Sequence, residues 1–148
     1  MRDDTAATLK KIGGLYNEKK KLLVQMADRC RFQSSLLDTE DFSAISESIN
    51  ENSHLISLMD SLDYEISATL DELRHITGMD KKMLSLFLEK NDESETAALR
   101  EHKNECTATL NTAFALFNNF LEAVQIKAQK YLTDFQELER IARVKELL

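Results

Sequence analysis

No proline interrupts this chain of 148 residues, and only three glycines occur in it. Sandwiches, barrels and α/β folds need turn-forming residues at short, regular intervals, which this chain does not supply. The sequence therefore predicts an all-α fold. Because 43% of the residues are hydrophobic and 30% are charged, we expect one helical domain over residues 1–148, with a core that needs neither metal nor disulfide.

Apolar residues recur at spacings of three, four and seven along most of the chain, the pattern of amphipathic helices. The predicted helices cover residues 5–37, 41–76, 81–90 and 92–145. In the first, the predicted core positions are Leu9, Ile12, Tyr16, Leu23, Met26, Cys30 and Leu37. In the second, they are Phe42, Ile45, Ile49, Ile56, Met59, Ile66, Leu70 and Leu73, with Asn52 and Asp63 as polar interruptions that fix the register.

Polar residues suited to helix ends separate these segments. The acidic turn over residues 38–41 and Asp80 can each accept hydrogen bonds from the first free N–H groups of a helix, and Asp92 with Glu95 has the spacing of a capping box. Gly78 suits a helix C-terminus. The Gly13-Gly14 pair lies inside the first helix and predicts a kink or a close helix contact.

The helix lengths and the charges predict how the helices are arranged. Residues 1–37 carry a net charge of +4 and residues 38–76 a net charge of −9, as expected of two neighbours that attract each other. We expect an antiparallel up-down-up bundle of three long helices with a short connecting helix. The third helix is much longer than the other two, so about 25 Å of it should project past the turn between them.

The projecting segment, residues 124–148, carries an apolar stripe that needs a partner in water. The predicted partner-binding residues are Val124, Ala128, Tyr131, Phe135, Leu138, Ile141 and Val144. Three occupants remain open at this point: a protein client, a second copy in a homodimer, or the chain itself folding back.

No motif predicts an enzyme or a cofactor site. The Glu51–His54 and Glu72–His75 pairs have the spacing of di-iron ligands, but both lie on one helix and face away from its predicted core side, so we expect no metal. His102 has no second ligand in its turn. The two cysteines, Cys30 and Cys106, fall at different heights along the bundle and are expected to be reduced.

The net charge of −7 argues against nucleic acid as a partner, because phosphate binding needs a basic face. The only basic run, Lys19–Lys21, lies in an otherwise mixed helix and predicts a solvated face, not a membrane surface. The sequence contains no long apolar run and no apolar signal region, so we expect no membrane insertion and a cytoplasmic location.

With this layout, the chain resembles the FlgN-like family, cytosolic chaperones for the hook-filament junction proteins of the bacterial flagellum. The resemblance rests on Leu36-Leu37, on the turn and helix start Asp38-Thr-Glu-Asp-Phe-Ser-Ala-Ile45, on Glu51–Ile56, and on Leu110-Asn111 and Asn118–Leu121. Glu40 stands where the family usually has Gly. The resemblance implies an export chaperone that holds the terminal helices of flagellar hook-associated proteins and delivers them to the type III export apparatus. The alternatives are a self-associating structural coiled coil and another secretion chaperone, such as that of the filament cap.

Overall fold

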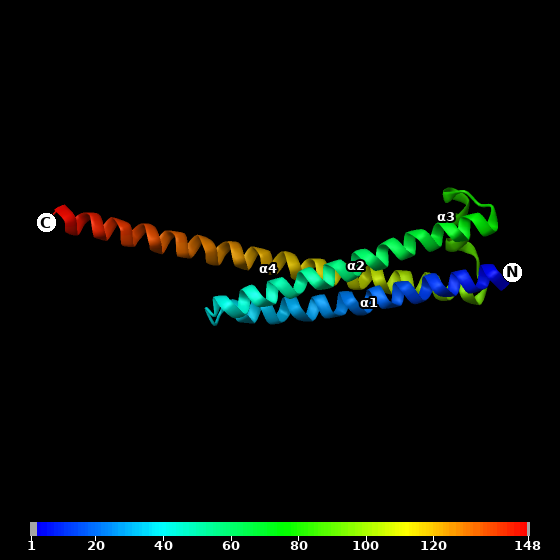
Figure 1. Ribbon diagram of the computed structural model, residues 1–148, viewed down its shortest axis with the longest axis horizontal. Coiled ribbons are helices and arrows are strands. Elements are labelled where there is room, and N and C mark those ends of the chain that lie inside the picture. The colour runs from blue at the N-terminus through cyan, green and yellow to red at the C-terminus, as the bar shows by residue number, and fades with distance from the viewer. Residues whose placement is uncertain (1–2, 148) are drawn as a thin grey trace.

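The computed structural model describes residues 3–147, and within them every regular element is an α-helix. The elements are α1 (Asp3–Leu37), α2 (Phe42–Thr77), α3 (Lys81–Lys90) and α4 (Ser94–Leu147). The all-helical prediction is therefore confirmed. In Figure 1, α2 runs back along α1, whereas α4 runs in the same direction as α1 and continues well beyond the turn that joins α1 to α2.

The helices begin and end at residues whose side chains or backbone satisfy the free peptide groups. Asp41 accepts a hydrogen bond from the Ala44 N–H at 3.0 Å, and Asp80 accepts one from the Met83 N–H at 2.8 Å. Gly78 ends α2 in the left-handed conformation (φ 70°), where its N–H donates to the Arg74 carbonyl. Before α4, Asn91 instead of the predicted Asp92 accepts the hydrogen bond that closes the turn, and the helix begins at Ser94.

The central element of the bundle is α1, which packs along both α2 and α4, while α2 and α4 make few direct backbone contacts. At one end, a cluster of buried leucines and isoleucine joins all four helices: Leu9, Ile12, Leu73, Leu84 and Leu99. Further along, Leu23, Ala27, Cys106 and Ala113 form a second cluster between α1 and α4. Small residues at this contact let the two helices approach closely.

Charged side chains join the three long helices at their margins. Lys19 pairs with Asp63 at 2.6 Å and Arg29 pairs with Glu51, linking α1 to α2. Lys20 pairs with Glu105 of α4 at 2.8 Å. Because these pairs are partly exposed, each contributes only about 0–1 kcal/mol, but all of them join the neighbours that the packed clusters define.

The core face of α2 differs from the predicted one. Phe42, Ile49 and Ile56 were predicted to be buried, but they are 60%, 42% and 43% exposed. The face that packs on α1 keeps the predicted row through Asn52, Met59, Ile66 and Leu73, but its other row lies one residue earlier in each heptad. It consists of Ser48, Asn52, Leu55, Met59, Leu62, Ile66, Thr69 and Leu73, at alternating spacings of four and three. The prediction was right for Ile66 and Leu73, which are buried, and wrong for the Phe42, Ile49 and Ile56 row because it ranked positions by apolarity alone.

A buried polar cluster specifies this face. Gln33 of α1 is 1% exposed, and its side-chain N–H donates to the Ser48 carbonyl at 3.0 Å. The Asn52 side chain donates to the Gln33 side-chain oxygen at 3.2 Å. A buried amide left without partners costs about 1–3 kcal/mol, so α2 is held in the orientation that joins Gln33 to Asn52.

Gly13 lies at a close contact between α1 and α4, whereas the neighbouring Gly14 faces open space. Substitutions at the two positions therefore test the predicted close helix contact. A Cβ atom on Gly13 would lie 3.6 Å from the Leu99 Cα and 3.4 Å from the His102 ring, whereas one on Gly14 would meet nothing within 4 Å. We expect Gly14→Ala to stabilise the protein by about 0.5–1 kcal/mol through helix propensity. Gly13→Leu should destabilise it by roughly 1–3 kcal/mol by forcing α1 from α4.

Urea denaturation of the two variants against the parent measures both effects. Equal stabilities of Gly13→Leu and the parent would show that α1 and α4 are not in close contact at this level.

Among residues 3–147, none of the helices combines the length and the hydropathy that crossing a membrane requires.

Candidate partner-binding surface

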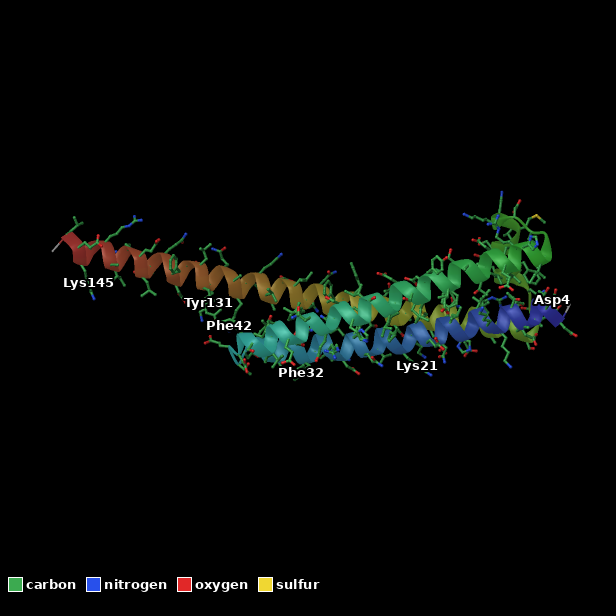
Figure 2. All side chains as sticks on the ribbon, viewed as in Figure 1. Asp4, Lys21, Phe32, Phe42, Tyr131 and Lys145 are labelled. Atoms are coloured by element: carbon green, nitrogen blue, oxygen red, sulfur yellow. The ribbon has the colours of Figure 1, made fainter. Side chains whose placement is uncertain are left out.

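Helix α4 projects as a single helix beyond the α1–α2 turn. Residues 132–147 lie past the last contact with the turn, a length of about 24 Å at 1.5 Å per residue. All of them are exposed, and Figure 2 shows their side chains around the free helix. Phe135 is 59% exposed and Leu138 is 66% exposed. The chain thus presents apolar side chains on a helix that no other described segment covers.

The α1–α2 turn touches α4 just before this projecting end. The rings of Phe42 and Tyr131 lie edge to face with centroids 5.5 Å apart, and Glu40 pairs with Lys127 at 3.6 Å. Partial burial and the adjacent Glu40 carboxylate raise the pKa of Tyr131 above its ordinary value. Among residues 3–147, Glu40 is the one non-glycine residue with a positive φ (59°), in the left-handed region.

Of the predicted partner-binding residues, only some share one face. Val124, Ala128, Tyr131, Phe135 and Leu138 follow spacings of four and three, although Val124 and Tyr131 are half-buried. Ile141 lies on a different row of α4, whose members are seven residues apart. The upper members of this row are buried towards α1: Leu99, Cys106, Ala113 and Phe120. Val144 flanks that row on the other side. Both are exposed because α1 has ended at this height.

The shared face extends much further up α4 than the predicted segment. The same spacing runs without a break through ten apolar positions, here named the α4 seam: Leu110, Phe114, Phe117, Leu121, Val124, Ala128, Tyr131, Phe135, Leu138 and Ala142. Phe114 is 62% exposed, and Leu110 and Leu121 are exposed as well. The predicted partner-binding residues begin at Val124 and do not include this upper half.

Two signals in the sequence mark this upper half. One is the unbroken alternation of four and three, which continues past the residues that α1 covers. The other is charge: between residues 107 and 126 only Glu122 is charged. A helix with a solvated outer face normally carries many charges, and depletion of charge is typical of the centre of a protein interface.

A row of α2 side chains lies beside the seam. Phe42 touches Tyr131 at one end, and Leu70 and Lys103 line one cavity at the other end. Phe42 lies 28 residues before Leu70 on α2, and Tyr131 lies 28 residues after Lys103 on α4. The two pairs therefore fit one antiparallel register of α2 and α4. Between these ends the α2 row continues through Ile49 and Ile56, which are exposed. Both the α2 row and the seam therefore present apolar side chains to solvent.

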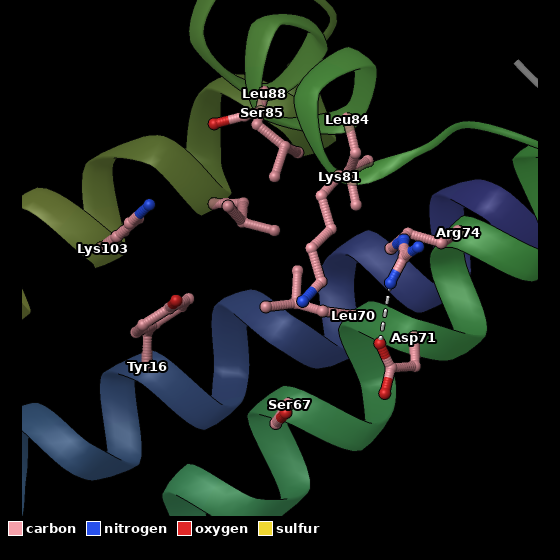
Figure 3. A pocket seen from close by; sticks show the side chains of 11 residues that line it. Tyr16, Ser67, Leu70, Asp71, Arg74, Lys81, Leu84, Ser85, Leu88 and Lys103 are labelled. Atoms are coloured by element: carbon pink, nitrogen blue, oxygen red, sulfur yellow. Dashed lines mark hydrogen bonds and ion pairs between the residues drawn. The ribbon is translucent and has the colours of Figure 1, made fainter.

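A cavity of about 310 Å³, open to solvent, is lined by residues of all four helices. Figure 3 shows Lys81 reaching into it from α3, and the Arg74 guanidinium bonded to Asp71 at 3.3 Å. Burial raises the pKa of Tyr16, whose ring forms part of the wall. The cavity lining combines the cations Arg74, Lys81 and Lys103 with the Asp71 carboxylate and the hydroxyls of Tyr16, Ser67 and Ser85.

The residues considered as metal ligands lie apart from these surfaces. Glu51 is engaged by Arg29, and His54, Glu72 and His75 are exposed on α2. In the described part of the chain, no three side chains of the metal-binding types gather at one place. Cys30 and Cys106 are buried free thiols, and burial raises the pKa of each.

Neither a family model, nor a curated protein, nor a solved structure matches this chain.

Proposed function

We propose that this protein is a chaperone that binds an amphipathic helix of a protein client along the α4 seam. The observation that carries the proposal is the exposed seam itself, ten apolar positions in a 4-3 repeat on one helix, with its last part free of any neighbour. Helix-in-groove recognition uses this kind of surface, since anchors at such spacings fit one face of a partner helix.

The physical setting favours binding over catalysis. Apolar patches of this extent are rarely left in contact with water and usually mark interaction sites. Phe114, Phe117, Tyr131 and Phe135 provide aromatic anchors, the residue types that often dominate binding energy at interfaces. Ile49 and Ile56 of α2 are exposed as well and offer a client helix further apolar surface. We accordingly propose that the protein acts in the cytoplasm, without enzymatic activity and without a cofactor.

The particular clients proposed are the flagellar hook-associated proteins, kept unassembled before type III export. Support comes from the FlgN-like sequence features described above. One structural detail accords with them: Glu40, at the position where the family usually has Gly, has a positive φ, the conformation that Gly adopts most easily. The alternatives of another secretion chaperone and of a structural coiled coil predict different occupants for the same seam.

A matched pair of substitutions tests client binding. Leu138 and Ile126 are both apolar residues of α4, exposed to 66% and 65% respectively, but only Leu138 lies on the seam. We expect Leu138→Asp to weaken binding of a peptide from the C-terminal helix of a hook-filament junction protein at least tenfold, about 1.4 kcal/mol. Ile126→Asp should bind as the parent does. Isothermal titration calorimetry with both variants measures this.

The thermal melting temperature of each variant provides the control for folding. Equal peptide affinities for Leu138→Asp and Ile126→Asp, with both variants folded, would refute the assignment of the seam. No binding of junction-protein peptides to the parent would refute the proposed clients.

A further inference from the structure

We propose that a second copy of this chain covers the α4 seam, with the two α4 helices antiparallel and crossing near residue 126. The projecting end of each copy would then lie on the upper half of the other copy's seam. The dimer is a resting state in which the client-binding surface is hidden. Only this last regulatory role rests on the proposed function; the dimer follows from the seam alone.

The seam is complementary to itself in one antiparallel register. In an antiparallel coiled coil, each position of one heptad row packs opposite a position of the other row. A single alignment brings all ten seam positions into apolar layers between the two copies. These layers are Leu110 with Ala142, Phe114 with Leu138, Phe117 with Phe135, Leu121 with Tyr131, and Val124 with Ala128. Each layer occurs twice because the contact is two-fold symmetric.

The shapes of the layers fit this alignment. The two-fold axis falls at Val124 and Ala128, where small side chains let the helices approach closely. The largest side chains, Phe117 and Phe135, meet further out. Leu138, the most exposed residue of the projecting seam, would be covered by Phe114, which is itself 62% exposed in the single chain. The same alignment therefore buries the two most exposed large apolar side chains of the seam.

The flanking charges favour the antiparallel orientation. In a parallel coiled coil, Asp134 of one copy would face Glu139 of the other, twice by symmetry, and like charges at these flanking positions disfavour a pairing. In the antiparallel alignment, Gln125 of one copy meets Gln125 of the other near the axis, and Asn118 faces Leu132 of the other copy, so these flanking pairs are uncharged. Lys127 also lies near the axis, but Glu40 of its own chain neutralises it.

The length of the seam is sufficient for a stable contact. Residues 110–142 span nearly five heptads, or about 48 Å of helix. A heptad pattern sustained over three or four repeats already predicts a coiled coil. The exposed side chains of Ile49 and Ile56 on α2 offer additional apolar surface for the incoming helix end. Because both copies contribute the same surface, the dimer closes without leaving a seam free.

Competition follows directly from shared residues. In the dimer, Phe135 and Leu138 are covered by Phe117 and Phe114 of the second copy. A client helix would cover the same two residues, so the client and the second copy cannot bind at once. Client binding would therefore require the dimer to dissociate, and a higher protein concentration would lower the apparent affinity for the client.

The full-length protein tests the dimer without any client. Sedimentation equilibrium over a dilution series should give a dimer for the parent and for Ile126→Asp, and a monomer for Leu138→Asp. A parent that remains monomeric at its highest soluble concentration would overturn the proposal. That result would leave client binding, measured with the junction-protein peptides, unaffected. Conversely, a parent that forms the dimer but binds none of these peptides even when diluted until it is monomeric would refute the proposed clients and leave the dimer standing.

Cysteine crosslinking tests the register. In a Cys30→Ala, Cys106→Ala background, Leu110→Cys and Ala142→Cys are made as separate variants. Mixed and oxidised, they should form a disulfide-linked heterodimer, because the two positions share a layer. Ala142→Cys alone should not crosslink, since its two copies would lie about 48 Å apart. Efficient crosslinking of Ala142→Cys with itself would show a parallel dimer and overturn the proposed arrangement. Circular dichroism of each variant verifies that it is folded.

Discussion

Replacing Leu73 with Asp is expected to destabilise the protein by at least about 4 kcal/mol, a large part of the 5–15 kcal/mol that a domain of this kind has in total. Leu73 is fully buried in the cluster where all four helices meet. A carboxylate there would be packed against buried apolar side chains from α1, α3 and α4. An unpaired buried charge is among the most costly single changes in a protein.

The sign of the pH dependence follows from the same burial. The introduced carboxyl would have a raised pKa in the folded state, because its neutral form is favoured there. The destabilisation should therefore be largest near neutral pH and smaller in acid, where the group is protonated in both states. Urea denaturation of Leu73→Asp at pH 7 and pH 5 measures this difference.

Tyr64→Asp on the same helix is the control, since Tyr64 is 76% exposed. Its stability should be close to that of the parent. If Leu73→Asp were as stable as the parent at pH 7, the cluster that joins the four helices would not be the core of the bundle.

Much of the helical structure was predictable from the sequence because it depends on local signals. Asp41, Asp80 and Gly78 cap helices where the sequence predicted it, since a cap requires only a suitable side chain or backbone conformation at one position. The buried side of α1 was also predicted at Leu9, Ile12, Leu23, Cys30 and Leu37, because its apolar positions form one dominant stripe.

The seam was predicted only in its lower half, for a reason of geometry. Periodicity identifies apolar faces but not which of them a neighbour covers. Helix α4 has two apolar faces side by side, one through Leu99 and Phe120 and the other through Leu110 and Phe114. Only the structure reveals that α1 covers the first and leaves the second exposed. The projecting end was predictable because no neighbour reaches it in any arrangement of helices with these lengths.

The Phe42, Ile49 and Ile56 row of α2 was wrongly predicted to be buried. Burial of Ser48 and of the hydrogen-bonded Asn52 against α1 is favoured over burial of these three larger apolar side chains. The row through Phe42, Ile49 and Ile56 is the more hydrophobic, yet α2 turns Ser48 and Asn52 towards α1. The Asn52 side chain has a partner only when Gln33 lies opposite it. Because the two residues lie on different helices joined by a turn, their pairing is visible in the structure but not in the sequence pattern. The polar pair thus selects one of two competing faces, as buried polar residues do in coiled coils.

This explanation predicts the outcome of a double-mutant cycle. Gln33→Leu alone should destabilise the protein by about 2 kcal/mol, because the Asn52 amide loses its bond while buried. Gln33→Leu with Asn52→Leu should recover at least that stability, because no amide then remains to be satisfied and the added side chains are apolar. Urea denaturation of the two single variants and the double variant gives the coupling free energy.

The double variant should also lose the preference between the two faces of α2. Without the Gln33–Asn52 bond, burial of Ile49 and Ile56 against α1 competes with the native face, and α2 can rotate by about one residue, or roughly 100°. A cysteine at position 49, placed by Ile49→Cys in the Cys30→Ala, Cys106→Ala background, reports this rotation through its rate of alkylation. With Gln33 and Asn52 present, the thiol should react quickly, as an exposed group does. In the double variant it should react several times more slowly. Equal rates in both backgrounds, together with additive free energies in the cycle, would mean that apolar packing alone orients α2.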